Sequence, residues 1–375
     1  MISSTINSDP LRLWRGSAVR PVLPDVDGHT LHSYFGISPE SPDEKSVLLF
    51  RSSRPDAHIG DVVKVDRQTG QATTMVEAVE CEDGHRQANQ QWICNGQYVM
   101  YMALRNGTFE VVRVDTRDLS QKTLASGRQL GWGQPGLDVV PLYGQHWNPG
   151  DHRDLELLNV RTGEIRTLVT AKQASVEHRD FIKRKLDGSN DISLFFPQMS
   201  PDGKRVYVKL SSPRDGQMRS EQASAREGLF VYETATGKCL GAQDMWGHPT
   251  WFTDSRHIQS CQWVLDSDTM QVRTLPNIPM PFGGVHAIPS PNERIVVTDI
   301  SKKDYLNPRN HWTIWMIDPA DGRHETLHVT DVEGDGTTSW RPAHPHPAFN
   351  ARGNRIYFNK VSRPWSTLHV IERPQ

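Results

Sequence analysis

Two histidines near the C-terminal end of the chain have a spacing that suits a shared ligand. His344 and His346 are each followed by proline, and both precede a turn and a strand-like run at residues 355–358. Side chains two positions apart in an extended segment point to the same face, so both imidazoles can face one cavity. Imidazole binds divalent metals when neutral and anions when protonated. The pair therefore predicts a metal site or an anion site, which the rest of the chain must position.

Histidine and amide side chains also precede other strand-like runs. A single histidine in a turn is usually a surface or capping residue, but several at equivalent positions of a repeat favour one shared rim. A purely structural rim is the alternative. Outside the C-terminal pair, the residues at these positions are His29, His32, Tyr34, His85, Gln91, Gln198, His248, Trp251 and His286.

Two short elements recur along the chain and supply the strands that would position these residues. One is a β-branched run, then an acidic or amide residue, then a turn ending near glycine, as at residues 62–70 and 157–163. The other is a hairpin, as at residues 197–208 and 289–297. Together they give four short strands per unit at a period of about 40–50 residues, which is typical of a β-propeller. Seven such units begin near His32, His85, Trp132, Phe196, His248, His286 and His344.

The sequence thus predicts an all-β fold, a seven-bladed β-propeller with four-stranded blades. We expect a single domain over residues 1–375, in which the final strand at 367–371 pairs with an N-terminal strand, because a closed ring leaves no exposed edge. Residues 1–27 would be an N-terminal extension or that closing strand, and 211–228 an insertion in the fourth blade. Helical periodicity is confined to residues 171–185. Two stacked β-sandwiches, the alternative, do not explain so regular a repeat.

Composition and charge exclude several classes of protein. The formal net charge is −2, so no basic field indicates a nucleic-acid partner. No apolar run approaches the length of a membrane span, and the N-terminus lacks the features of a secretory signal. We expect no membrane partner and a cytoplasmic protein, or a secreted one whose signal was trimmed. Four cysteines without CxxC spacing predict reduced, structural thiols. We also expect a monomer or a weak homodimer.

Several motifs together resemble those of a known enzyme group. Gly247-His248-Pro249 precedes Trp251, His286 precedes Ser290-Pro291, and the C-terminal histidine pair precedes a Tyr-Phe strand. This pattern is similar to oligogalacturonate lyase and its propeller-fold polysaccharide lyase relatives, which include lyases of ulvan and of rhamnose–glucuronate linkages. The likeness spans roughly residues 29–358, with the specific motifs in blades two and five to seven. It implies a carbon–oxygen lyase that cleaves a uronate-containing oligo- or polysaccharide by β-elimination and leaves an unsaturated uronate.

The resemblance also implies a divalent metal. In oligogalacturonate lyases one histidine of the penultimate blade and a Gln-x-x-His-x-His motif of the last blade hold it, and the matching histidines are His286, His344 and His346. The glutamine position is Arg341 here, and guanidinium has no acceptor and is always charged. Either three imidazoles and water hold Mn, Zn or Ca, of which Mn or Zn suits nitrogen ligands better, or Arg341 takes over the role of the metal.

The reaction requires particular side chains. The C5 proton of a uronate is removed and the oxygen at C4 is expelled, which needs neutralisation of the carboxylate, a base, and an acid for the leaving oxygen. His85 and His248 are candidates for the base or the neutraliser. The resemblance implies an arginine base from the fourth-blade insertion and does not choose between Arg219 and Arg226, either of which could also clamp the carboxylate. Tyr143 is a candidate acid, with a buried strand tyrosine as the alternative. The candidate substrate contacts are Arg341, Gln91, Gln198 and Trp251.

Two rival functions fit a propeller. One is a non-catalytic, TolB-like propeller that binds a protein or peptide, and it predicts that the rim histidines do not converge. The other is a propeller hydrolase or peptidase subunit, and the lack of a Gly-x-Ser-x-Gly elbow in the sequence counts against a serine hydrolase. Fold alone does not separate these functions, because propellers host many of them.

Overall fold

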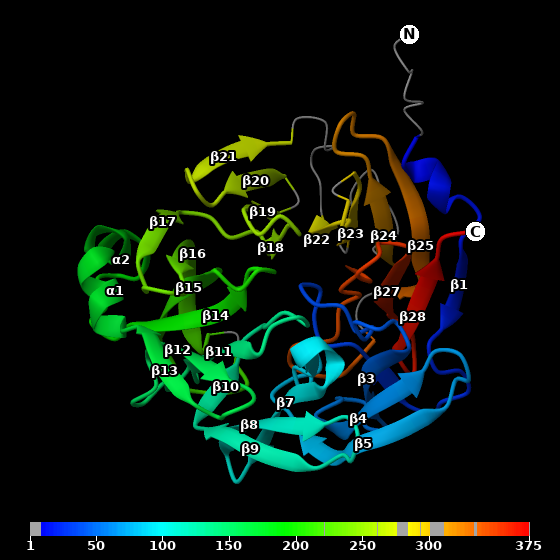
Figure 1. Cartoon of the computed structure of the whole chain (residues 1–375), viewed down its shortest axis with the longest axis horizontal. Helices are drawn as coiled ribbons and strands as arrows, with labels where there is room; N and C mark the ends of the chain where they lie inside the picture. Colours follow the sequence, from blue (N-terminus) through cyan, green and yellow to red (C-terminus); the bar gives the residue numbers. More distant parts are fainter. Residues whose placement is uncertain are drawn as a thin grey trace.

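The computed structural model describes residues 9–220, 222–260, 262–275, 284–292, 294–300, 311–333 and 336–374. Short antiparallel sheets follow one another around a common centre (Figure 1). Strands dominate these ranges, so the prediction of an all-β fold is confirmed.

Within the described ranges, five sheets have four strands each, paired in chain order. They consist of β6 (Gln91–Ile93), β7 (Tyr98–Arg105), β8 (Thr108–Asp115) and β9 (Gln121–Ser126); β10 (Arg128–Leu130), β11 (Val139–Gly144), β12 (Leu155–Asn159) and β13 (Ile165–Val169); β14 (Ser193–Met199), β15 (Arg205–Pro213), β16 (Ser224–Glu233) and β17 (Cys239–Gln243); β18 (Thr250–Trp251), β19 (His257–Gln259), β20 (Trp263–Asp266) and β21 (Gln271–Thr274); and β22 (Gly284–Pro289), β23 (Val296–Ile300), β24 (His311–Ile317) and β25 (His324–Glu333).

A further sheet joins the two ends of the chain. Its eight strands are β1 (Ala18–Pro21), β2 (His29–Leu31), β3 (Ser46–Ser52), β4 (Ile59–Asp66), β5 (Ala72–Glu80), β26 (Ala348–Phe349), β27 (Arg355–Lys360) and β28 (Thr367–Glu372). The N-terminal β1 pairs antiparallel with β28, from Ala18 opposite Glu372 to Pro21 opposite His369. The expected pairing of the final strand with an N-terminal strand is therefore confirmed, and the two strands lie side by side in Figure 1.

The recurring turns are stabilised, as the sequence predicts, by a side chain that accepts backbone hydrogen bonds and by a glycine. Asp66 ends β4, and its Oδ1 accepts hydrogen bonds from the backbone N–H groups of Gln68 and Thr69 at 2.9 and 2.8 Å. Gly70 closes the turn at a φ of 72°, a conformation that glycine adopts without a steric penalty. The same pattern recurs after β12, where Asn159 Oδ1 accepts from residues 161 and 162.

A cluster of aromatic side chains closes the centre of the ring. Its buried members include Tyr34, Phe35, Trp132 and Phe196. The ring centroid of Trp132 lies 4.8 Å from that of Tyr34 and 4.2 Å from that of Phe196. Because these four residues come from the β2–β3 connection, the β10–β11 connection and strand β14, they tie separate sheets to one apolar floor.

The helical segments are short. The helix expected over residues 171–185 is present as α1 (Ala171–Glu177) and α2 (Arg179–Lys185), with Thr170 Oγ1 capping the first by accepting from Gln173 N–H at 3.0 Å. Single 3-10 turns lie at η1 (Leu11–Trp14) and η2 (Cys94–Gly96). No helix in the part of the chain that the structure describes is long and apolar enough to cross a membrane. Within the range 211–228, the described residues 211–220 and 222–228 form the far end of the β15–β16 hairpin, whose pairing continues to Pro213 opposite Ser224.

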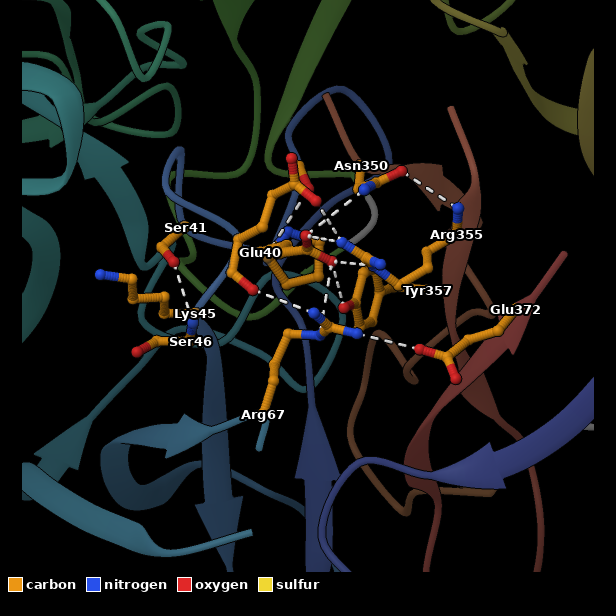
Figure 2. Close-up of polar contacts among 12 residues, drawn as sticks. Glu40, Ser41, Lys45, Ser46, Arg67, Asn350, Arg355, Tyr357 and Glu372 are labelled. Atoms are coloured by element: carbon orange, nitrogen blue, oxygen red, sulfur yellow. Dashed lines mark hydrogen bonds and ion pairs between the residues drawn. The ribbon is translucent and has the colours of Figure 1, made fainter. Parts of the chain in front are cut away.

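A buried ion-pair cluster reinforces the junction between the first and last strands (Figure 2). The Glu40 side chain is 1% exposed, and its two oxygens accept from Arg355 Nη2 and Nε at 2.7 and 2.8 Å. Tyr357 also donates to this carboxylate, and Asn350 Nδ2 donates to it at 3.3 Å. Arg67 pairs with Glu372 of β28 at 2.9 Å. The cluster thus connects the segment before β3 and the turn after β4 with β27 and β28.

We expect Glu40→Gln to lower the free energy of unfolding by about 3 kcal/mol, because the largely buried Arg355 guanidinium loses its bidentate partner and keeps only Glu44 as a counter-charge. Urea unfolding followed by tryptophan fluorescence measures this change. The matched control is Arg54→Met, which removes a surface pair with Asp56 and should leave the urea midpoint nearly unchanged. Equal effects of the two substitutions would contradict a stabilising role for the cluster.

Candidate active site

Four imidazoles converge at one end of the centre of the ring. His85, His286, His344 and His346 each offer a nitrogen, and these nitrogens all lie within 4.8 Å of one another. His85 lies in the connection between β5 and β6, His286 lies on β22, and the other two lie just before β26. The structure therefore brings together the three histidines expected at a metal and adds His85, which the sequence suggested as a base or neutraliser.

The orientation of two of these imidazoles is fixed from behind. His85 Nδ1 lies 3.1 Å from the carbonyl oxygen of Pro342, and His286 Nδ1 lies 2.9 and 3.0 Å from the carboxylate oxygens of Asp299 on β23. A carbonyl or carboxylate oxygen accepts hydrogen bonds, so each Nδ1 carries the hydrogen and each Nε2 keeps its lone pair. Asp299 also accepts from the backbone N–H of His346 at 3.1 Å. Such outer contacts are typical of metal-binding histidines.

Several nitrogens of the cluster are buried without a partner. Within the described residues, His286 Nε2, His344 Nδ1 and both ring nitrogens of His346 have no hydrogen bond. Burial is the main cause that lowers the pKa of all four histidines, to about 3 for His344, with neighbouring imidazoles or Arg341 adding to it. Neutral, converging lone pairs with no other partner fit a divalent cation. A set of imidazole nitrogens suits Zn or Mn better than Ca, which takes oxygen ligands.

Arg341 occupies the position at which the lyase motif has glutamine. Its Nη1 lies 3.7 Å from Oδ2 of the buried Asp83. Asp83 Oδ1 in turn accepts from the backbone N–H of His85 at 3.0 Å and that of Arg86 at 2.8 Å. One loop therefore supplies both the counter-charge of Arg341 and a fourth imidazole in the cluster.

A cavity of about 240 Å³ adjoins the imidazole cluster. The ring centroid of His248, one of its lining residues, lies 4.9 Å from that of His286. None of the described lining residues is acidic, and three are cationic. The lining consists of Tyr34, Phe195, Phe196, Lys209, Arg226, Trp246, His248 and Arg341.

The cations of the cavity depress one another's pKa values. Burial, followed by Arg341 and Arg86, lowers the pKa of Arg226 to about 10, and burial followed by Arg226 lowers the pKa of Lys209 to about 7. Burial and then His286 hold the pKa of His248 well below its usual value. An excess of positive charge in a partly dehydrated cavity favours an anionic ligand such as a carboxylate.

The structure separates the two candidate arginines of the β15–β16 hairpin. Arg226 lines the cavity. Arg219 lies outside it: its Nε donates to the carbonyl oxygen of Glu82 at 3.2 Å, and its Nη2 lies 3.5 Å from Glu80 Oε1. Of the two, only Arg226 is placed to meet a ligand of this cavity.

Tyr143 lies outside the cavity as well. It is fully buried on β11, and its hydroxyl accepts a hydrogen bond from Arg86 Nη1 at 3.1 Å. Its burial and its hydrogen bond fit the alternative interpretation of Tyr143, a buried strand tyrosine, better than the role of the acid. Tyr34 is the tyrosine that lines the cavity.

Three candidate substrate contacts are not brought to the cavity. Gln91 donates to the Gly131 carbonyl and accepts from Gly133 N–H, at 3.0 and 2.8 Å. Gln198 donates to Gly36 and accepts from Tyr207. Trp251 donates to the backbone carbonyl of Gln198 at 3.1 Å and stacks on Tyr207. The polar groups of all three link neighbouring sheets.

Sequence reasoning missed Asp299, Lys209 and Trp246. Asp299 had a visible signal, since it is a carboxylate in the apolar run Val296-Val297-Thr298-Asp299-Ile300, close to His286. Lys209 had none, because a lysine in a strand usually belongs to a solvated face. Trp246 precedes the Gly247-His248 motif, and its ring lies 4.1 Å from Lys209 Nζ.

No family model and no curated protein matches the chain. Solved structures with the same fold include an oligogalacturonate lyase in complex with manganese, at 16% identity and a TM-score of 0.65, with 96% of this chain and 94% of that chain covered. The oligogalacturonate lyase from Vibrio parahaemolyticus matches at 14% identity and a TM-score of 0.66, with 95% and 94% covered. The β-propeller domain of Cps50 (Swd1) from Myceliophteria thermophila matches at 10% identity and 0.52, with 92% and 99% covered. The resemblance to oligogalacturonate lyases is thereby confirmed at the level of the fold.

Proposed function

We propose that the protein is a polysaccharide lyase that cleaves a uronate-containing oligosaccharide by β-elimination, with a divalent metal held by His85, His286, His344 and His346. The observation that carries the proposal is the contact between two sites of complementary chemistry. A cluster of neutral imidazoles, several of whose ring nitrogens have no partner, adjoins a cavity lined by cations, and His248 connects the two. A uronate offers a carboxylate to the cations and further oxygens to the cluster.

Three of the lining residues have a direct part in the proposed reaction. Arg226 and Arg341 bind the carboxylate and neutralise its charge, which makes the C5 proton more acidic. Burial raises the pKa of Tyr34, so its hydroxyl stays protonated and can donate to the departing oxygen at C4. When bound, a divalent cation supplies Lewis-acid polarisation of a substrate oxygen. The aromatic floor under the site excludes water and strengthens these interactions.

The seven-blade count belongs to the same proposal. The eight-stranded sheet divides naturally where β2 and β28 meet, since that parallel contact has a single residue pair, Thr30 opposite Thr367. On one side lie β2–β5, and on the other β26–β28 with β1. Together with the five four-stranded sheets, these two groups of four strands give seven blades.

Partner binding without catalysis is less well supported. That function predicted rim histidines that do not converge, whereas four imidazole nitrogens lie within 4.8 Å of one another.

The test is direct. Protein loaded with Mn²⁺ or Zn²⁺ is incubated with oligogalacturonate, ulvan and rhamnose–glucuronate glycan, and the ultraviolet band of the unsaturated uronate is followed. We expect product from at least one glycan and a rate at least about 10-fold lower after chelation, because the cluster then holds no cation. Absence of product from every uronate glycan would contradict the lyase. A rate unaffected by complete metal removal would contradict only the metal.

A further inference from the structure

We propose that Lys209 is the general base that removes the C5 proton of a uronate bound by Arg226 and Arg341. This inference rests on the proposed function and names a residue that the sequence patterns did not indicate. Those patterns suggested His85, His248, Arg219 or Arg226 as the base.

Lys209 lines the cavity from β15, between two strands whose pairing with β15 is irregular beside it. On β15, Val208 pairs with Phe230 and Leu210 pairs with Glu227, so two residues of β16 stand opposite Lys209 alone. One of them is Gly228, at a φ of 76°. This is a β-bulge, a feature that redirects side chains and is frequent beside active sites.

The other edge of β15 is irregular at the same place. Lys209 pairs with Phe195 of β14, but the next pair joins Tyr207 to Gln198, which leaves Phe196 and Pro197 opposite Val208. Phe196 has a φ of 62°, a strained value for a phenylalanine. The two bulges face each other across the strand, and the side chains of Lys209, Phe195 and Phe196 all line the cavity.

Burial and neighbouring cations favour the neutral form of the Lys209 amine. Arg226 and Arg341 share its cavity and disfavour a further positive charge there. The Trp246 ring, whose centroid lies 4.1 Å from Nζ, and the nearby carboxylate of Glu227 on β16 act in the opposite direction. Within the described residues, however, no carboxylate forms an ion pair with Lys209. Burial, followed by Arg226, lowers the pKa of Lys209 to about 7, so a large share of the amine is neutral near neutral pH.

The remaining lining groups are poor bases. Arg226 keeps its charge because its pKa stays near 10, and Arg341 is a guanidinium with no acceptor. His248 lies against the imidazole cluster, with its ring centroid 4.9 Å from that of His286. Tyr34 holds its proton. A base needs both an available lone pair and sufficient basicity, and Lys209 combines them.

The step balances without a further reactant. The neutral Nζ takes the C5 hydrogen as a proton, and the C5–H electron pair becomes the second bond between C4 and C5. The C4–O bond breaks, and the departing oxygen takes a proton from the Tyr34 hydroxyl. The Lys209 ammonium then loses its proton to solvent and Tyr34 regains one from solvent. The products are an unsaturated uronate and a sugar with a free hydroxyl.

The test compares Lys209→Met and Lys209→Ala with the wild type on whichever uronate glycan is cleaved. We expect kcat to fall by about 10²-fold or more in both variants, with KM changed by only a few-fold, because the base acts on the reacting proton. Small primary amines should restore part of the Lys209→Ala rate, more strongly for more basic amines. The matched control is Lys204→Met, which alters an exposed lysine in the β14–β15 turn and should leave both constants unchanged.

The pH profile gives a readout that a merely structural lysine would not move. Because the base must be unprotonated, wild-type kcat/KM should rise with pH through the Lys209 pKa, near pH 7, and Lys209→Met should lose this limb. In ¹³C-dimethylated protein, the resonance absent from Lys209→Met should titrate near pH 7. Titration of that resonance above about pH 9 would overturn the assignment.

Different experimental outcomes would contradict the role of Lys209 and the proposed lyase function. If the wild type cleaves a uronate glycan and Lys209→Met has an unchanged kcat, or loses only affinity, Lys209 is not the base and the lyase stands. If the wild type cleaves no uronate glycan, the proposed function is overturned and this role falls with it.

Discussion

His286→Ala will abolish stoichiometric metal binding and slow glycan cleavage by about 10³-fold or more, equivalent to about 4 kcal/mol of transition-state stabilisation. The reason is the place of His286 in the cluster. Its Nε2 is buried without another partner, and its Nδ1 is held by both oxygens of the buried Asp299. Removal of this imidazole leaves three nitrogens and takes one hydrogen-bond donor from the buried Asp299 carboxylate, which keeps those of the backbone. Mass spectrometry of the dialysed protein measures the bound metal, and the cleavage rate at saturating substrate measures the loss of activity.

Two further variants make this prediction specific. Asp299→Asn keeps a hydrogen-bond acceptor for His286 but removes the charge, so we expect metal affinity to fall by about 10- to 100-fold. His324→Ala alters an exposed histidine at the start of β25 and should bind metal as the wild type does. If His286→Ala retained one metal ion at unchanged affinity, the four-imidazole site would be contradicted. Melting curves of the metal-free forms separate loss of a ligand from loss of the fold.

The architecture was predictable because its signals are local. The turn after β4 needs an aspartate that accepts two backbone hydrogen bonds and a glycine with positive φ, and both can be read from Asp66 and Gly70. A turn of this kind recurs along the chain at the period of a propeller. Pairing between the two ends of the chain followed from the need to cover an edge strand, and β1 and β28 meet as expected. The ion pair between Glu40 and Arg355 gave no such signal, because its partners are 315 residues apart.

The site was predictable only in part, because its members depend on how loops and registers meet. The spacing of His344 and His346 and the position of His286 within the repeat were enough to suggest that they converge. The orientation of His85 depends on a carbonyl oxygen 257 residues away in sequence, at Pro342. Whether Arg219 or Arg226 faces the centre depends on the register of the β15–β16 hairpin, which the sequence does not specify.

Lys209 shows most clearly why a pattern can hide a functional residue. In the run Val206-Tyr207-Val208-Lys209-Leu210, a regular strand would place the lysine on one face of its sheet. Bulges in the two neighbouring strands, β14 and β16, lie beside it, and its side chain lines the cavity together with Phe195 and Phe196. Bulges are set by the pairing of three strands, so no single stretch of sequence contains the information.

Arg341→Gln will raise KM for a uronate glycan by about 10²-fold and leave metal affinity within about threefold of the wild type. The guanidinium lines the cavity beside Arg226, so its loss removes a charge-assisted contact to the carboxylate, while the four imidazoles remain. Steady-state kinetics and a metal titration measure the two effects separately. Arg219→Gln is the matched control, since that arginine bonds to the Glu82 carbonyl outside the cavity, and its KM should stay unchanged.

A double substitution then tests why this chain has arginine where the lyase motif has glutamine. If His85 provides the ligand that glutamine provides in the lyase motif, His85→Ala will weaken metal binding by about 10²-fold. Adding Arg341→Gln to His85→Ala will then recover part of the lost metal affinity, because an amide oxygen can ligate a cation. The effects of the two substitutions on metal affinity would then be non-additive, although in the wild type His85 belongs to the imidazole cluster and Arg341 lines the cavity. Unchanged metal affinity in His85→Ala, or a gain in metal affinity from Arg341→Gln alone, would instead mean that His85 is not a ligand. In that case the three imidazoles of His286, His344 and His346 form the site, and Arg341 stands where a fourth ligand is missing.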